Sequence, residues 1–305
     1  MQGPARHMRP WQARPCWLAA GLLVVATSSA VASTAASAAS SVRDDCLDYA
    51  RRLGSVKAHY CDHPGWYRGA GGSVRGRPIL MRDIPAGAMA PRVLVVGGIH
   101  GDELAAISIV FDWLERLEDD NPQRLHWRVT PSMNPDGLLD RPSRRMNAHG
   151  VDLNRNLPTP QWERYSRVYW EQHTRRDPRR YPGPGPMSEP ETRWLVDEIA
   201  RFQPDVIVAV HAPLDSVDFD GPAEAPRRIG HLHLNLLGTY PGSLGNYAGV
   251  QLGIPVLTVE LSSAGIMPTS AQRVAIWGDL HDWLQKKIPA KPLLPLADES
   301  ARRSR

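Results

Sequence analysis

The stretch VVGGIHGDELAA (95–106) decides the fold, because an apolar run ends there in two glycines and a helical pattern begins. Residues 91–96, PRVLVV, have the pattern of a short buried strand. Residues 102–119, DELAAISIVFDWLERLED, place their apolar side chains on one face of a helix. A strand, a loop and a helix in this order form the repeating unit of α/β proteins. The loop between them carries His100 and Glu103.

The same alternation continues along the chain. The pattern predicts a hairpin strand over 72–85, strands over 125–132, 205–210 and 255–261, and helices over 188–202 and 270–288. Ser188 and Glu191 have the spacing of a capping box at the start of one of these helices. Strands that alternate with helices predict an α/β fold with a mixed, largely parallel central sheet flanked by helices on both faces.

The N-terminal segment has the composition of a secretion signal. Over residues 1–38, arginines precede the apolar run WLAAGLLVVA (17–26), and small residues then offer cleavage sites near 32 or 38. The apolar run is shorter than the roughly 20 residues of a membrane-spanning helix. We therefore expect a periplasmic or secreted protein with no stable membrane span once the signal is removed. An uncleaved N-terminal anchor is the alternative.

The rest of the chain has the composition of one globular domain, with 42% hydrophobic and 22% charged residues overall. We expect a catalytic domain over 42–288 and a flexible tail, broken by prolines, over 289–305. The net charge of +4 includes three arginines of the signal segment, so that +1 remains without it. Such a weak charge gives no basis for nucleic acid binding.

The cysteines are few. Cys16 lies in the expected signal, which leaves Cys46 and Cys61 in the exported chain. An even pair in an oxidising compartment suggests one disulfide, and two unrelated thiols are the alternative. Two cysteines cannot complete a zinc site made of cysteine alone, so the histidines are the better candidates for metal binding.

Three unusual polar residues stand at the ends of predicted strands. His100 follows the strand over 91–96, His211 follows the strand over 205–210, and Glu260 lies near the end of the strand over 255–261. Sites in open α/β sheets form outside the carboxyl ends of the strands. A catalytic zinc takes three protein ligands, so His100 and Glu103 from one turn, with His211 as the third, are candidates. Hydrogen-bonded structural groups are the alternative.

Several motifs resemble those of the zinc carboxypeptidase family, in the same order and over about residues 72–285. They are GGIHGDE (97–103), NPDG (134–137), RMNAHGVDLNRNLP (145–158), the strand-terminal His211 and VEL (259–261). The resemblance implies one zinc ion per chain, bound by His100, Glu103 and His211. It also implies that Glu260 is the general base and proton shuttle. His231 and His233 match no such motif.

The resemblance assigns further roles in the site. It implies that Arg145 stabilises the developing oxyanion, although the neighbouring Arg144 is an alternative by one position. Asn154 and Arg155 match the pair that binds the terminal carboxylate of the substrate. Asp152 matches the carboxylate that accepts the other ring proton of the first zinc histidine. Tyr240 or Tyr247 would take the place of a substrate-capping tyrosine.

Three further stretches resemble the members of this family that act on murein peptides. They are GPGPMSEPET (183–192), HAPLDSVDFDGP (211–222) and YPGSLGNYAG (240–249). The resemblance implies hydrolysis of the γ-D-glutamyl–meso-diaminopimelate amide of a murein peptide, or of a bond in another small peptide. A general or peptidoglycan-stem metallocarboxypeptidase is the enzymatic alternative, and a non-catalytic cell-wall-binding protein is the alternative of another class. The charge run RRDPRR (175–180) is expected to be solvated, or to contact an anionic peptide.

Overall fold

The structure is a computed structural model that describes residues 40–119 and 124–293. The segment expected to be a secretion signal, and residues 294–305 of the expected tail, lie outside the described residues. Among the helices that are described, none combines the length and the apolar content needed to cross a lipid bilayer.

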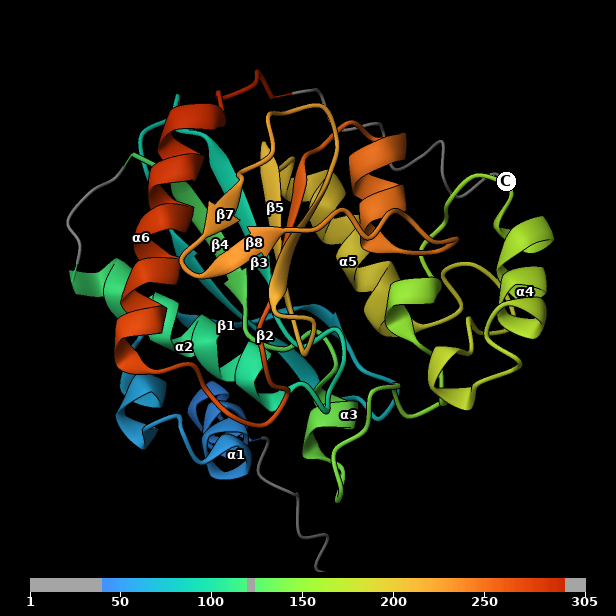
Figure 1. Cartoon of the computed structure of the whole chain (residues 1–305). Helices are drawn as coiled ribbons and strands as arrows, with labels where there is room; N and C mark the ends of the chain where they lie inside the picture. The colour runs from blue at the N-terminus through green and yellow to red at the C-terminus, as the bar shows by residue number, and fades with distance from the viewer. Residues whose placement is uncertain (1–39, 120–123, 294–305) are drawn as a thin grey trace, which may run out of the picture. The chain divides into compact units, whose positions relative to one another are not determined.

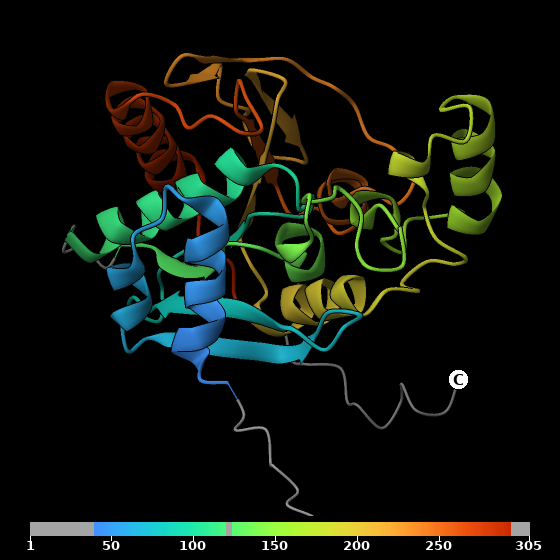
Figure 2. The same ribbon diagram turned by 90° about the horizontal axis from the view of Figure 1, so that it is seen from below.

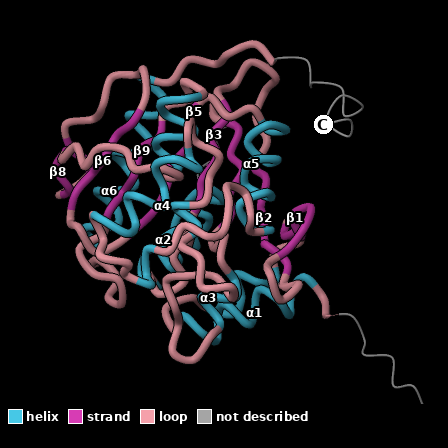
Figure 3. Tube along the Cα trace, turned by 90° about the vertical axis from the view of Figure 1, so that its right-hand side faces the viewer, coloured by secondary structure: helices cyan, strands magenta, loops and turns pink. Residues whose placement is uncertain are grey.

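One mixed sheet organises the described part of the chain. Its strands are β1 (Trp66–Gly72), β2 (Pro78–Ile84), β3 (Arg92–Val96), β4 (His126–Thr130), β5 (Val206–His211), β6 (Ser216–Asp220), β7 (Arg228–Ile229), β8 (Leu232–Leu234) and β9 (Val256–Glu260). They follow one another in the order β1-β2-β4-β3-β5-β9-β6-β8-β7, much of which can be traced across Figure 3. The central strands β4, β3, β5 and β9 are parallel. At one edge β2 pairs antiparallel with both β1 and β4. At the other edge β6 pairs antiparallel with β9 and parallel with β8, and β7 pairs antiparallel with β8. The predicted fold class is confirmed.

Helices cover both faces of this sheet. The α-helices are α1 (Val42–Leu53), α2 (Leu104–Asp119), α3 (Pro135–Leu139), α4 (Trp162–Gln172), α5 (Pro190–Phe202) and α6 (Ser270–Lys287). Shorter helical segments are η1 (Ala58–Asp62), η2 (Leu153–Arg155), η3 (Pro178–Arg180) and the π-helical η4 (Gly245–Gln251). Figure 1 shows α2 and α6 on one side of the sheet and α5 on the other, and Figure 2 shows α1 beside α2.

Alternate residues of the central strands β3 and β5 enter two separate cores. In β5, Val206, Val208 and Val210 pack with α1, α2 and α6, whereas Ile207 and Ala209 pack with α5 and η4. Successive side chains of a strand point to opposite faces, so a strand covered on both sides reads as a continuous apolar run. This is why the central strands were recognisable from sequence.

Strand β6 departs from this pattern. Val217 and Phe219 belong to the core formed with α2 and α6. Asp218 and Asp220 alternate with them and therefore point to the face that carries α5 and η4. The sequence SVDFD was not predicted as a strand, although its period of two between apolar and polar residues is typical of one.

Two expected helix starts differ from the structure. Helix α2 begins at Leu104 rather than at residue 102. The capping box expected between Ser188 and Glu191 is wrong, because α5 begins at Pro190 with Glu189 as its N-cap. The Ser188 hydroxyl instead donates to Oε1 of Glu189 at 2.7 Å, and Glu191 accepts a tertiary bond from another segment. Proline suits the first helical position, since the N–H it lacks would have no partner within the helix.

The two ends of the described chain are attached to the body. Cys46 of α1 and Cys61 of η1 form a disulfide, and both residues are buried. After α6, the backbone N–H of Lys291 donates to Oδ1 of Asp205 at 2.9 Å. The carbonyl of Lys291 accepts from Nη2 of Arg92 at 3.1 Å. The start of the expected tail is therefore bound to the sheet.

Candidate active site

The loop after β3 places His100 and Glu103. Gly98 has a φ of +54°, in the left-handed region that glycine adopts without strain. A Cβ on Gly101 would overlap the backbone of the facing Gly137, so only glycine allows the two loops to approach this closely. The backbone N–H of Glu103 then bonds to the carbonyl of His100 at 3.4 Å, which closes a turn just before α2. Both side chains consequently point to the same side.

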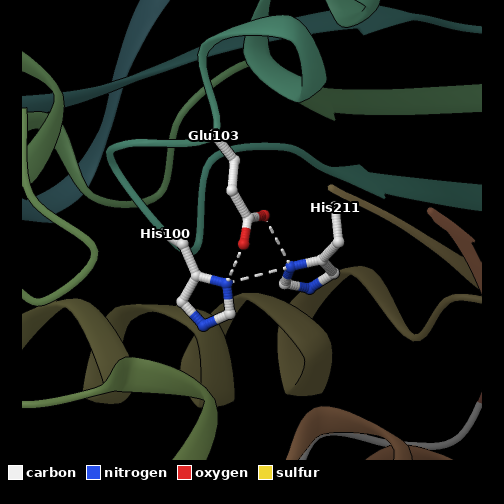
Figure 4. A group of neighbouring side chains, drawn as sticks. All are labelled: His100, Glu103 and His211. Atoms are coloured by element: carbon white, nitrogen blue, oxygen red, sulfur yellow. Dashed lines mark hydrogen bonds and ion pairs between the residues drawn. The ribbon is translucent and has the colours of Figure 1, made fainter. Parts of the chain in front are cut away.

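His100, Glu103 and His211 meet at the carboxyl ends of β3 and β5. Nδ1 of His100 lies 2.8 Å from Oε1 of Glu103, and Nδ1 of His211 lies 3.0 Å from Oε2. The two Nδ1 atoms are 3.1 Å apart (Figure 4). Within the described chain, this is the one group of three or more histidine, cysteine or carboxylate side chains with ligand atoms within 4.8 Å of one another.

The chemistry of this group fits a divalent metal. Two imidazole nitrogens and one carboxylate are a typical donor set for catalytic zinc. The three residues are 3%, 4% and 4% exposed. Burial opposes the ionisation of Glu103, but the charges of His100 and His211 outweigh it and hold the pKa of the carboxyl below its usual range. A buried anion between two imidazoles is the environment that a cation would neutralise.

Asp152 supports the group from the other side of His100. Its Oδ1 lies 3.1 Å from Nε2 of His100, and its Oδ2 accepts from Nη2 of Arg145 at 2.9 Å. Although burial disfavours the charged form, Arg145 and His100 keep the pKa of Asp152 well below its usual range. An ionised partner on Nε2 fixes the tautomer that leaves Nδ1 free to bind a metal.

The two candidate oxyanion arginines occupy different places. Arg145 lines the cavity beside the metal group, and its Nη1 lies 3.5 Å from Oε1 of Glu103. Arg144 points elsewhere and forms an ion pair with Asp140 at 2.7 Å. Of the two, Arg145 is therefore the cation that a bound substrate would meet.

Glu260 lies at the end of β9, directly beside His211 in the strand register. Its side chain lines the same cavity, and the residue is 8% exposed. Oε2 has no hydrogen-bond donor among the described residues. Burial raises the pKa of Glu260. A buried carboxylate with one unbonded oxygen is suited to accept a proton from a small ligand in the cavity.

Asn154 and Arg155 lie on η2 and line the cavity from a second side. Oδ1 of Asn154 accepts from the N–H of Leu244 at 2.8 Å. The guanidinium of Arg155 lies 4.5 Å over the ring of Tyr240, and its Nε has no acceptor among the described residues. A buried guanidinium with an unused donor is suited to bind a carboxylate.

The two candidate tyrosines differ in position. Tyr240 lines the cavity and supports Arg155 through its ring. Tyr247 is buried in the core with α5, and it does not line the cavity. A role in contact with substrate is therefore open to Tyr240 but not to Tyr247.

The cavity has a volume of about 270 Å³ and is also lined by residues to which the sequence analysis had assigned no individual role. These are Arg180, from the RRDPRR run, and Asp218 and Asp220 of β6. Within the RRDPRR run, Arg179 forms an ion pair with Asp102 at 2.7 Å, so this run is tied to the loop that carries the metal group. The alternation of SVDFD was the signal that could have located the two aspartates.

Comparison with known proteins identifies the family. Residues 63–216, half of the chain, match the zinc carboxypeptidase family. The chain belongs to this family. It is 34% identical to murein peptide amidase A of Vibrio campbellii over 63% of this chain and 77% of that protein. It is 30% identical to murein peptide amidase A of Escherichia coli K12 over 71% of this chain and 89% of that protein.

Solved structures show the same fold. The murein-tripeptide amidase of Escherichia coli O157 superposes with a TM-score of 0.50 and 27% identity, over 72% of this chain and 90% of that one. Bovine thrombin-activatable fibrinolysis inhibitor, in complex with tick carboxypeptidase inhibitor, gives a TM-score of 0.57 at 16% identity, over 81% and 95%. This zinc carboxypeptidase family member is therefore a hydrolase with the fold of its family.

Proposed function

We propose that the protein is a zinc-dependent amidase that removes the C-terminal residue of a murein peptide by cutting the γ-D-glutamyl–meso-diaminopimelate amide. One observation carries the proposal. His100, Glu103, His211, Glu260 and Arg155 all line a single cavity whose size suits one substrate residue. The two relatives named murein peptide amidase A support the choice of substrate.

The metal would be held by His100, Glu103 and His211. When bound there, zinc lowers the pKa of a coordinated water from 15.7 to about 7, which supplies a nucleophile at neutral pH. Glu260 accepts the proton of the attacking water through its unbonded Oε2 and returns it to the leaving amine.

The arginines orient the substrate and stabilise the charge that develops on it. Arg155, with Asn154 beside it, binds the terminal carboxylate and so sets the scissile amide one residue away. Arg145 stabilises the oxyanion, because a fixed cation aimed at the carbonyl binds the transition state more tightly than the ground state. Asp152 keeps Arg145 and His100 in these positions.

Hydrolysis of a defined tripeptide tests the proposal. Purified zinc-loaded protein is incubated with L-alanyl-γ-D-glutamyl-meso-diaminopimelate, and free diaminopimelate is measured by mass spectrometry. A matched peptide linked through the α-carboxyl of glutamate serves as the control. We expect release from the γ-linked peptide and much slower release from the α-linked one. No release from the γ-linked peptide by zinc-loaded protein would refute the proposed substrate.

The second candidate is a carboxypeptidase that acts on ordinary C-terminal residues or on stem peptides of the wall. Membership of the zinc carboxypeptidase family supports this candidate. Its substrates, like the murein tripeptide, end in a free carboxylate that Arg155 would bind. Equal rates on the γ-linked and α-linked peptides would support this candidate. A protein that binds the wall without catalysis would release nothing from either peptide.

We also propose that the protein is exported, with residues 1–38 as a cleaved signal. The composition of that segment supports the proposal, as does the pair formed by Cys46 and Cys61. Mass spectrometry of the periplasmic fraction should find a mature N-terminus near residue 33 or 39. Recovery of the intact chain with the membrane would instead indicate an uncleaved anchor.

A further inference from the structure

The face of the sheet under η4 carries both the catalytic groups and two carboxylates. In the register of β5 and β9, His211 pairs with Glu260 and Ala209 pairs with Thr258. In the register of β9 and β6, Ser216 lies beside Glu260 and Asp218 beside Thr258. Figure 3 shows β5, β9 and β6 following one another across the sheet. The two aspartates of β6 thus continue the row of side chains that begins at the metal group.

The strand geometry sets how far these carboxylates lie from the reaction centre. Residues on one face of a strand are spaced about 7 Å apart. Asp218 is two residues, and Asp220 four residues, beyond the position that lies beside Glu260. The carboxylates therefore lie about 7 and 13 Å along the strand from the level of Glu260. A ligand held at the metal group by its amide would reach them with the far end of a long side chain.

Both carboxylates are built into the cavity wall. Asp218 is 6% exposed, and its Oδ1 accepts from the N–H groups of Phe219 and Leu237 at 2.9 and 3.0 Å. Asp220 lies against η4. A Cβ added to Gly249 would come within 2.6 Å of the Cβ of Asp220, and a Cβ added to Gly245 would overlap the carboxylate of Asp220. Glycines at these two positions of η4 leave the space that the Asp220 side chain occupies.

Charges of both signs line the cavity: Arg145, Arg155 and Arg180, and Asp218 and Asp220. Arg155 lies within electrostatic reach of Arg145 and Arg180, whereas the charged group that acts on Asp220 is Asp218. Burial, together with the charge of Asp218, raises the pKa of Asp220 to about 6. Two carboxylates that disfavour each other's ionisation in one cavity are both stabilised when a cation binds between them.

We infer that Asp218 and Asp220 select a substrate whose C-terminal residue carries an ammonium group at the far end of its side chain. The inference rests on the proposed function, because Arg155 must hold the terminal carboxylate for the side chain to run along β6. An ammonium is the cation that fits. No third histidine, cysteine or carboxylate among the described residues joins the pair to form a metal-ligand set. Diaminopimelate and lysine have the required group, and norleucine has the same chain length without it.

Binding of free amino acids tests this selection separately from hydrolysis. Zinc-loaded wild-type protein is titrated by calorimetry with meso-diaminopimelate, lysine, norleucine and 2-aminoadipate. The same titrations are made with Asp218→Asn and Asp220→Asn. Asp197→Asn is the matched control, because it removes one exposed carboxylate on α5 that does not line the cavity. Thermal unfolding of each variant verifies that it is folded.

We expect wild-type protein to bind lysine and diaminopimelate about tenfold more tightly than norleucine, since a charge-assisted hydrogen bond has this order of effect. The preference should fall toward unity in Asp218→Asn and Asp220→Asn and persist in Asp197→Asn. Equal binding of lysine and norleucine, no measurable binding of lysine, or a preference that survives both cavity substitutions would overturn the inference.

The hydrolysis assay distinguishes the two proposals. If the preference for an ammonium is found but the γ-linked tripeptide is not cut, the proposed reaction fails and the selection by β6 stands. If the tripeptide is cut equally well with norleucine in place of diaminopimelate, the reaction stands and the selection fails.

Discussion

Asp152 bonds with one carboxylate oxygen to His100 and with the other to Arg145, at 3.1 and 2.9 Å. A single buried side chain therefore positions a metal ligand and the cation proposed to stabilise the oxyanion. Its backbone also belongs to the site, because it precedes η2, which carries Asn154 and Arg155. The negative charge of Asp152 strengthens both side-chain contacts.

Replacement of Asp152 by asparagine should weaken metal binding. Loss of the charged partner of a ligating histidine typically lowers metal affinity by about 10- to 100-fold. Competition with a chromophoric chelator measures the affinity for zinc. Asp102→Asn is the control, because Asp102 lies in the same loop and pairs with Arg179 instead of His100. An affinity that is equal in both variants would show that Asp152 does not support the metal group.

Replacement of Glu260 by glutamine should slow turnover strongly without loss of metal. The amide has nearly the shape of the carboxylate but cannot accept the proton of water, so kcat should fall by about 10²- to 10⁴-fold. Elemental analysis should still find close to one zinc per chain, since Glu260 is not among the three grouped ligands. An unchanged rate would exclude Glu260 as the general base.

Arg145 and Arg144 form a natural pair of test positions. Arg145→Gln should lower kcat by about 10²- to 10³-fold, the effect expected for loss of one oxyanion-stabilising group. Arg144→Gln should leave kcat nearly unchanged, because Arg144 points to Asp140 and does not line the cavity. Steady-state kinetics on the γ-linked tripeptide checks both. Similar losses in the two variants would contradict the assignment to Arg145.

The disulfide should contribute to stability. Cys46 and Cys61 have a sequence separation of 15, and closure of a loop of this size is worth about 3 kcal/mol in the chain-entropy description. The double variant Cys46→Ser, Cys61→Ser should lose about this much free energy of unfolding in denaturant titrations. Thiol titration of the unfolded wild-type protein should detect neither cysteine before reduction. Two titratable thiols at that stage would show that the pair is not oxidised.

Asp220 should make stability depend on pH. Its pKa rises from the ordinary 3.8 to about 6 in the folded protein, so the folded state binds this proton more tightly than the unfolded chain. Ionisation of Asp220 therefore destabilises the folded state. This destabilisation is absent below pH 3.8, grows as the pH rises, and reaches its full size above about pH 6. Asp220→Asn should raise the Tm more at pH 8 than at pH 5, without added ligand. An equal change at both pH values would indicate an effect other than charge.

The fold and the metal group follow from short-range patterns. Residues 93–96 and 206–210 are apolar throughout because helices cover both faces of these strands, and this makes the strands recognisable from sequence. Parallel strands bring their carboxyl ends to one edge, so a histidine after each of two such strands predicts a shared site. The structure does place His100 and His211 in contact.

Other parts depend on contacts between distant segments and were not predictable. Residues 133–187 contain α4 and the turns around Asn156, whose amide Nδ2 donates to the carbonyls of Pro182 and Gly185 at 2.8 and 2.9 Å. Such bonds link residues nearly 30 positions apart, so they produce no periodic pattern of apolar residues in the local sequence. Strand β6 was missed for another reason: its acidic residues face a cavity, so they replace the apolar side chains that mark the neighbouring strands.

Strand β6 has a consequence for how such enzymes diversify. The proposed catalytic groups come from the loop after β3 and from the ends of β5 and β9, whereas the two carboxylates proposed to meet the far end of the ligand come from β6. A strand keeps its backbone when the side chains on one face are exchanged, because its ladder bonds involve only main-chain atoms. Substitutions at two positions can therefore change the preference for the substrate side chain while the catalytic residues stay the same. Substrate specificity and catalysis can then evolve independently.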